Sequence, residues 1–197
     1  MAASAQLFER WAATYDQSLI ATLADPVHAA VLTAAHHHLP RPRHLLDLGC
    51  GTGRLLHKAA DRFPTARLIG MDAAHAMLTV ARRTTPSEGS PAMVRARAEQ
   101  LPFPDASLDL ITATLTCRHW RGVRAGLAEI TRVLTADGLF VYADVHPPAP
   151  RRRWWRRSER GGRHLLGQTT GLQVIEDRPI AGCGPLLPCR LLVTCRS

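Results

Sequence analysis

This sequence of 197 residues lacks long apolar runs, paired cysteines and, with one exception, lysine. No uninterrupted apolar stretch reaches the roughly 18 residues that a membrane span requires, so no membrane span is expected. Residues 1–10 lack the charged and then apolar pattern of a secretory signal. The five cysteines include no CxxC pair, which argues against a zinc site or a disulfide framework. Together these absences predict a cytoplasmic protein with reduced, mostly buried thiols.

Arginine supplies almost all of the positive charge, because Lys58 is the only lysine in a chain with a formal net charge of +9. Such a charge can indicate a nucleic acid or an anionic surface as partner. A biased genomic composition, rich in arginine and alanine, explains it equally well. Five arginines lie in Arg151–Arg157, beside Trp154 and Trp155. We therefore expect a basic, flexible segment at residues 146–158, which either binds phosphate-rich partners or is a solvated loop.

Helical and strand patterns alternate along the chain, which predicts an α/β domain with a mostly parallel sheet. The expected helices cover residues 5–18, 26–39, 53–63, 74–84, 121–134 and about 159–170. The expected strands cover residues 44–48, 67–72, 91–96, 108–114, 139–145, 172–180 and 189–195. The first two helices, split at Asp25-Pro26, would form an N-terminal helical cap over residues 1–40. No internal repeat or long linker interrupts the pattern, so residues 1–197 are expected to form a single domain.

The strongest local feature is a glycine-rich turn between the first strand and the next helix, Asp47-Leu48-Gly49-Cys50-Gly51-Thr52-Gly53. Its spacing is GxGxG. The dinucleotide-binding fingerprint GxGxxG would need a glycine where Arg54 stands. The carboxylate of Asp47 would repel a pyrophosphate. It would favour a ligand that carries an ammonium and a sulfonium, as S-adenosylmethionine (SAM) does.

A second acidic residue, Asp72, ends the second strand about 20 residues after the glycine turn, where a carboxylate can accept the two hydroxyls of a ribose. SAM and nicotinamide dinucleotides share that ribose, so Asp72 is compatible with both. Capping of the helix at residues 74–84 is the alternative role, and one carboxylate can serve both purposes. Asp47 and Arg54 are what favour SAM over a dinucleotide.

Six segments of the chain carry further motifs: residues 8–16, 45–53, 70–78, 98–109, 114–120 and 129–138. In this order and spacing they resemble the class I SAM-dependent methyltransferases, and especially the branch typified by the ubiquinone and menaquinone biosynthesis methyltransferases. The resemblance is clear over residues 5–145. It implies a Rossmann-like, doubly wound α/β fold. The seven strands would have the order 3-2-1-4-5-7-6, with strand seven antiparallel and helices on both faces.

The resemblance also implies SAM as cofactor and S-adenosylhomocysteine (SAH) as product, bound at the carboxyl ends of strands one, two and four. Arg10 would pair with the SAM carboxylate, or else lie on a solvated helix face. Tyr15 would close over the ligand, or else pack in the core. The implied cofactor-binding residues are Arg10, Tyr15, Asp47, Gly49, Cys50, Gly51, Gly53, Asp72, Ala73, Met77, Ala98, Glu99, Thr114 and Leu115.

Three residues are candidates to face the transferred methyl group: Arg118, His119 and His146. His119 is the candidate catalytic residue, because it follows strand four, where the family faces SAM or substrate. A loop or capping histidine is the alternative for it. No metal site is expected, since the consecutive histidines His36-His37-His38 point in different directions on a helix.

The function that follows is transfer of a methyl group from SAM to a small-molecule acceptor by in-line displacement. A general base is needed only if the acceptor must first lose a proton. Two alternatives stay open. The chain could act on or bind RNA or DNA through Arg151–Arg157, or it could be a SAM-binding module without catalysis. A dehydrogenase is disfavoured by Asp47 and Arg54.

Overall fold

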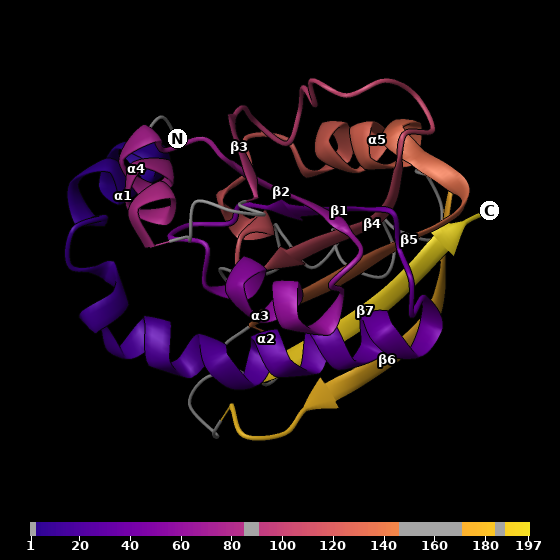
Figure 1. Cartoon of the computed structure of the whole chain (residues 1–197), viewed down its shortest axis with the longest axis horizontal. Helices are drawn as coiled ribbons and strands as arrows, with labels where there is room; N and C mark the ends of the chain where they lie inside the picture. The colour runs from indigo at the N-terminus through magenta and orange to yellow at the C-terminus, as the bar shows by residue number, and fades with distance from the viewer. Residues whose placement is uncertain (1–2, 85–90, 146–170, 184–187) are drawn as a thin grey trace.

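The computed structural model describes residues 3–84, 91–145, 171–183 and 188–197 (Figure 1). Seven strands form one sheet in the order β3-β2-β1-β4-β5-β7-β6, with β7 antiparallel to both of its neighbours. The predicted strand order and the antiparallel seventh strand are therefore confirmed. The strands are β1 (His44–Leu48), β2 (Arg67–Asp72), β3 (Ala92–Arg95), β4 (Leu108–Thr114), β5 (Leu134–Val145), β6 (Leu172–Ile180) and β7 (Cys189–Arg196).

Helices cover both faces of this sheet. α2 and α3 lie along one face and α5 along the other (Figure 1). Two short 3-10 helices, η1 and η2, stand at the carboxyl edge of the sheet. The helices are α1 (Ala3–Trp11), η1 (Tyr15–Gln17), α2 (Leu19–His38), α3 (Arg54–Arg62), α4 (His75–Thr84), η2 (Cys117–His119) and α5 (Val123–Val133).

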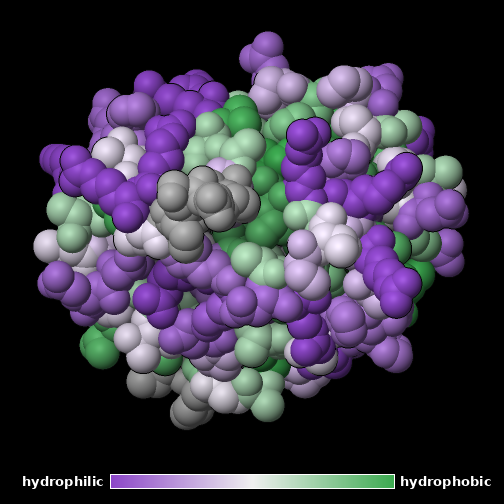
Figure 2. Space-filling model, in the orientation of Figure 1, coloured by the Kyte–Doolittle hydropathy of each residue, from purple (hydrophilic) through white to green (hydrophobic). Residues whose placement is uncertain are grey.

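A separate hydrophobic core holds each helical layer to the sheet. On the α2–α3 face, Val31 and Leu56 are fully buried with Leu45 of β1. On the other face, Ile130 of α5 packs with Phe140 of β5. Adjacent strand residues point to opposite faces, so the nearly continuous apolar strands supply both cores. The outer face seen in Figure 2 is largely hydrophilic, with a narrow hydrophobic strip over the sheet between α4 and α5.

The N-terminal helices differ from the prediction. The break lies at residues 12–18 instead of at Asp25-Pro26, and α2 continues through Pro26 for 20 residues. Ser18 caps α2, because its hydroxyl accepts a hydrogen bond from the amide of Ala21 at 3.2 Å. An interior proline costs a helix about 3 kcal/mol. Burial of the α2 face and the ion pairs of Asp25 with α3 offset this cost.

α2 is also long and apolar enough, by length and composition alone, to cross a membrane. Its 18-residue window has a mean hydropathy of 1.2, and 44% of that window is buried in the fold. The helix packs on β4, β5 and β7. Packing against the sheet therefore accounts for the hydropathy of α2.

The other predicted elements lie within a few residues of the observed ones, apart from the start of β5. A strand was expected only over residues 139–145, whereas β5 begins at Leu134, directly after α5, and includes Asp137 and Gly138. Leu108 pairs with Leu134 and Leu110 with Leu139, so the register shifts between these two pairs. The predicted helix at about 159–170 and the basic segment at residues 146–158, with His146, lie outside the described residues.

Candidate functional site

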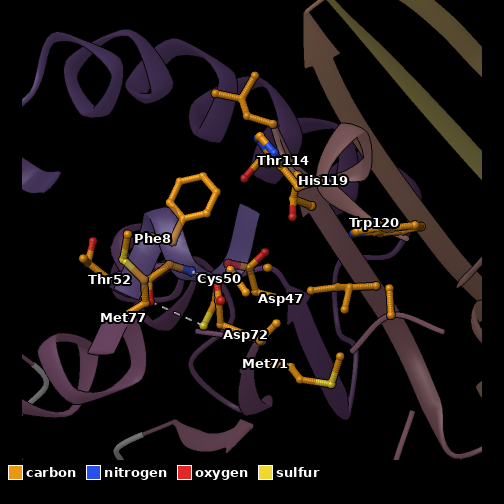
Figure 3. A pocket seen from close by; sticks show the side chains of 18 of the residues that line it. Phe8, Asp47, Cys50, Thr52, Met71, Asp72, Met77, Thr114, His119 and Trp120 are labelled. Atoms are coloured by element: carbon orange, nitrogen blue, oxygen red, sulfur yellow. Dashed lines mark hydrogen bonds between the residues drawn. The ribbon is translucent and has the colours of Figure 1, made fainter. Parts of the chain in front are cut away.

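A cavity of about 320 Å³ lies at the carboxyl ends of β1, β2 and β4 (Figure 3). Open parallel sheets bind ligands in this position, where the strand order reverses. All but two of the expected site residues line it. They are Tyr15, Asp47, Gly49, Cys50, Gly51, Asp72, Ala73, Met77, Ala98, Glu99, Thr114, Leu115 and His119.

The two exceptions are Arg10 and Gly53. Arg10 is exposed on α1 and is not among the residues that line the cavity. Gly53 is the N-cap of α3, with a φ angle of +84°. A Cβ atom there would lie 3.3 Å from Cβ of Ala81 on α4, so this glycine allows two helices to approach each other.

The three glycines of the turn thus have different physical roles, although all have positive φ angles. At Gly49 a Cβ atom would lie 2.2 Å from the hydroxyl of Thr116, so the fold itself excludes a side chain. At Gly51, with a φ angle of +54°, a Cβ atom would meet nothing within 4 Å. Gly51 lines the cavity, and it is therefore the position where the backbone leaves room for a ligand.

Asp47 places a buried carboxyl beneath the glycine turn. Its side chain accepts a 2.8 Å hydrogen bond from the hydroxyl of Thr112, and the residue is 1% exposed. Burial raises its pKa to about 7, and the neighbouring Asp72 acts in the same direction, while Thr112 opposes the shift. No described residue forms an ion pair with Asp47. A buried carboxyl without a cationic partner fits a ligand that supplies the positive charge.

Asp72 ties the glycine turn to the start of α4. One carboxylate oxygen accepts the amide of Gly51 at 3.0 Å, and the other accepts the amide of Ala74 at 2.8 Å. Asp72 does not cap the amides of α4 itself, because Ala74 precedes the helix and Glu9 accepts its first two amides. Each carboxylate oxygen can accept a second hydrogen bond, so ribose hydroxyls can still be bound.

Glu99 has a comparable structural contact on the other side of the cavity. Its carboxylate accepts the amides of Arg121 and Gly122, at 2.5 and 2.9 Å, at the start of α5. A carboxylate at a helix N-terminus is stabilised by the helix dipole. The neighbouring Ala98 is 5% exposed and also lines the cavity.

Leu115 turns the chain sharply after β4. Its φ angle of +55° is unusual for a bulky residue, and its amide donates to the carbonyl of Ala143 at 2.8 Å. Strained conformations of this kind are concentrated at functional sites. The turn leads directly into η2, which carries Arg118 and His119.

Aromatic residues of α1 and η1 form the outer wall of the cavity. Tyr15 packs edge-on against Trp11 at 5.0 Å, and Phe8 packs edge-on against His119 at 5.1 Å. Glu9 fixes this wall in place, because its carboxylate caps the first amides of α4 at 2.7 and 2.8 Å. Figure 3 shows Phe8 and His119 on the same side of the cavity, with Asp47 and Asp72 below them.

His119 is partly buried in η2, and its environment keeps the imidazole neutral. Burial, followed by the nearby charge of Arg118, lowers its pKa to about 4. The backbone amide of His119 donates to the carbonyl of Thr116 at 2.8 Å. A neutral imidazole at this place can form a hydrogen bond with an acceptor molecule, but at that pKa it is a weak base.

Next to His119, Arg118 forms an ion pair with a buried residue of β5. Its Nη1 atom lies 2.5 Å from Oδ1 of Asp144, whose side chain is 2% exposed. Burial raises the pKa of Asp144, and Arg118 opposes that shift. The pair therefore connects η2 to the carboxyl end of β5.

The described residues include no group of three or more histidine, cysteine or acidic side chains that could hold a metal ion. In the His36-His37-His38 run, His38 contacts Glu176 of β6 at 2.7 Å, so it anchors the end of α2. All five cysteines lie in the described part of the chain. Four are buried, as expected, and none of the five forms a disulfide there.

Several contacts that build the site could not be predicted from the sequence. Thr116 lies in one of the six family-like segments, but no local pattern indicates that it packs on Gly49. No local pattern indicates the hydrogen bond that Asp16 accepts from the hydroxyl of Thr52 at 2.6 Å, or the contacts of Glu9 and Asp144. Each pair joins residues 26 or more positions apart, beyond the reach of helical or strand periodicity.

Residues 46–142 match the family described as "Methyltransferase domain". Among curated relatives, malonyl-[acyl-carrier protein] O-methyltransferase of Geobacter sulfurreducens is 35% identical over 136 residues, covering 69% of this chain and 50% of the relative. Demethylmenaquinone methyltransferase of Thermus thermophilus is 36% identical over 108 residues, covering 54% and 49%. The chain thus spans about half the length of the curated relatives it matches.

Solved structures with the same fold include a chain in the complex between the Haloferax volcanii Trm112 methyltransferase activator and a putative methyltransferase. It superposes with a TM-score of 0.76 at 20% identity, covering 96% of this chain and 97% of that one. YcgJ of Bacillus subtilis superposes with a TM-score of 0.68 at 19% identity, covering 86% and 98%. Together, the matched domain, the relatives and the strand order identify residues 46–142 as a domain of the class I SAM-dependent methyltransferases, in the type 11 branch.

Proposed function

We propose that this chain transfers a methyl group from SAM to a small-molecule acceptor by in-line displacement. One observation carries the proposal: a buried carboxyl without a cation partner, an open glycine turn and a carboxylate at the end of β2 line the same cavity. Asp47 would receive the ammonium of the ligand, Gly51 would allow its close approach, and Asp72 would accept the ribose hydroxyls.

When bound, SAM supplies a methyl group already activated by a sulfonium, so the protein mainly needs to position the acceptor and exclude water. The aromatic wall of Phe8, Trp11 and Tyr15 can exclude water from the cavity. We assign His119 as the residue that contacts the acceptor. With a pKa of about 4, it would act through a hydrogen bond to the acceptor in preference to strong base catalysis.

The names of the relatives favour an acceptor that is not a nucleic acid. One relative is named for demethylmenaquinone, a small molecule, and the other for a malonyl group carried on the acyl-carrier protein. The reduced thiols also support the proposed cytoplasmic location, because disulfides are rare in the cytosol.

The test is transfer of labelled methyl groups from SAM to three pools: a small-molecule cell extract, total RNA and DNA. We expect label only in the small-molecule pool. Label in RNA or DNA, with retention on nucleic acid that falls steeply as salt increases, would instead support the nucleic-acid alternative. SAH binding without transfer to any pool would support a module without catalysis.

A further inference from the structure

Charged side chains are distributed unequally between the two ends of the cavity. Its carboxylates are Asp47, Asp72 and Glu99, and each already accepts hydrogen bonds from protein donors: Asp47 from Thr112, Asp72 from the amides of Gly51 and Ala74, and Glu99 from the amides of Arg121 and Gly122. Among the described residues, η2 itself contributes the cationic Arg118 and the neutral His119 to the lining and no carboxylate, and Arg121 lines the cavity just after η2. An anionic group would therefore meet the least repulsion at the η2 end.

Arg118 is held so that part of its guanidinium remains available. Only Nη1 contacts Asp144, and it contacts a single carboxylate oxygen. That oxygen also accepts the amide of Val145 at 2.8 Å. The remaining N–H groups of Arg118 have no other hydrogen-bond partner among the described residues, and its side chain is 29% exposed. A guanidinium with free donors on one edge can bind a second carboxylate through two parallel hydrogen bonds.

Within the described part of the chain, the contact between Arg118 and Asp144 leaves hydrogen-bonding groups of both side chains unused. The second oxygen of Asp144 is buried and has no hydrogen-bond partner among the described residues. A pair serving stability alone would be expected to use both oxygens, because an unsatisfied buried acceptor is costly. Asp144 instead fixes the direction of Arg118 toward the cavity.

The same end of the cavity also has an apolar wall. Phe8 and Trp11 of α1 line it together with Leu7 and Ile20. The last two are 49% and 41% exposed, so their apolar surface is open to a ligand. Such a wall can bury an apolar body whose polar group reaches Arg118.

We propose that Arg118 selects acceptors that carry a carboxylate on an apolar body, with Asp144 as a positioning residue that orients the guanidinium. This inference rests on the proposed function, because it assigns the acceptor class for the same site. It concerns recognition of the acceptor and does not depend on which atom of that acceptor receives the methyl group.

The test is calorimetric titration of the SAH-saturated protein with matched pairs: medium-chain and aromatic carboxylic acids, each beside its primary amide. In the wild type, the acids should bind about tenfold more tightly than their amides, or better, which corresponds to about 1.4 kcal/mol. The double variant Arg118→Gln/Asp144→Asn replaces both charged groups with neutral amides. It should fold and bind SAH normally but lose the preference for acids.

Two further variants make the test specific. Arg121→Gln removes another cationic side chain of the cavity lining and should leave the preference intact. Asp144→Asn alone should weaken acid binding, because Arg118 is released, whereas a long-range charge effect would strengthen it. Any of three results would overturn the inference: acids and amides bind equally well, no acid binds, or the double variant keeps the preference for acids. Failure of SAH itself to bind would overturn the proposed function instead.

Discussion

At the β2 end of the cavity, the carboxylate of Asp72 is fixed by backbone amides, whereas at the η2 end Arg118 and His119 are held by other side chains. Asp72 bonds to Gly51 and Ala74 across neighbouring strand ends. Arg118 pairs with a residue 26 positions away, and His119 packs on Phe8 of α1. The first arrangement suits a ligand shared by a whole family. The second can change without disturbing the first, so it suits an acceptor that differs between relatives.

The largest expected effect comes from substitutions in the glycine turn, where Gly51 leaves space for the ligand and Gly49 packs against the protein itself. Gly51→Val should reduce SAH affinity by more than about a hundredfold, because the side chain would fill the space kept for the ligand, at a folding cost of only about 1–2 kcal/mol for its positive φ angle. Gly49→Ala should instead destabilise the fold by about 3 kcal/mol, because it collides with Thr116. Calorimetry and chemical unfolding of both variants measure these effects. Normal SAH binding by Gly51→Val would contradict the assigned ligand position.

A smaller loss is expected at Asp72. Asp72→Ala should weaken SAM binding by more than about tenfold, since it removes the carboxylate assigned to the ribose and frees two backbone amides. Asp72→Asn keeps one acceptor oxygen, so its affinity for SAM should lie between those of the wild type and Asp72→Ala. Affinity measured by calorimetry tests this order. An affinity of Asp72→Ala close to that of the wild type would remove the ribose assignment.

The pH dependence of binding tests Asp47. Its carboxyl must lose a proton to pair with the ligand ammonium, and its pKa in the free protein is about 7. SAH affinity should therefore fall about tenfold between pH 8 and pH 6. Asp47→Asn should bind weakly at both values and remove this slope. A wild-type affinity that is constant with pH would count against the role of Asp47.

The same shift makes a prediction about stability. Because burial raises the folded-state pKa of Asp47 above its unfolded value, the free protein loses stability as the pH rises through about 7. The free energy of unfolding of Asp47→Asn, minus that of the wild type, should thus be larger at pH 8 than at pH 5. Urea unfolding without ligand measures this difference. The opposite sign would mean that the carboxyl is not buried as described.

The smallest effect concerns the contact between α1 and η2. A double-mutant cycle of Phe8→Ala and His119→Ala should give a coupling energy of about 1 kcal/mol, typical of an edge-to-face pair. Unfolding of the four proteins provides the value. A coupling near zero would show that α1 does not rest on η2 in solution.

Most of the fold was predictable, because alternating helical and strand periodicity is a local signal and the strands are nearly continuous apolar runs. Asp47, Gly51 and Asp72 were predictable as a set, since their spacing along one strand–turn–helix–strand unit fixes where they meet. The helix break predicted at Pro26 was wrong, because the local cost of this proline to the helix is offset by packing that only the tertiary structure contains. Arg118 pairs with Asp144, and Glu9 with α4, because the fold brings distant segments together. Local sequence patterns do not predict such contacts.

The most direct test of the account is titration calorimetry at pH 8 with SAH and, separately, with a nicotinamide dinucleotide, on the wild type and on Asp47→Asn. We expect the wild type to bind SAH with one site per chain and to ignore the dinucleotide, and Asp47→Asn to lose at least tenfold in SAH affinity, about 1.4 kcal/mol. Binding of the dinucleotide in place of SAH, or equal SAH binding by both proteins, would contradict it.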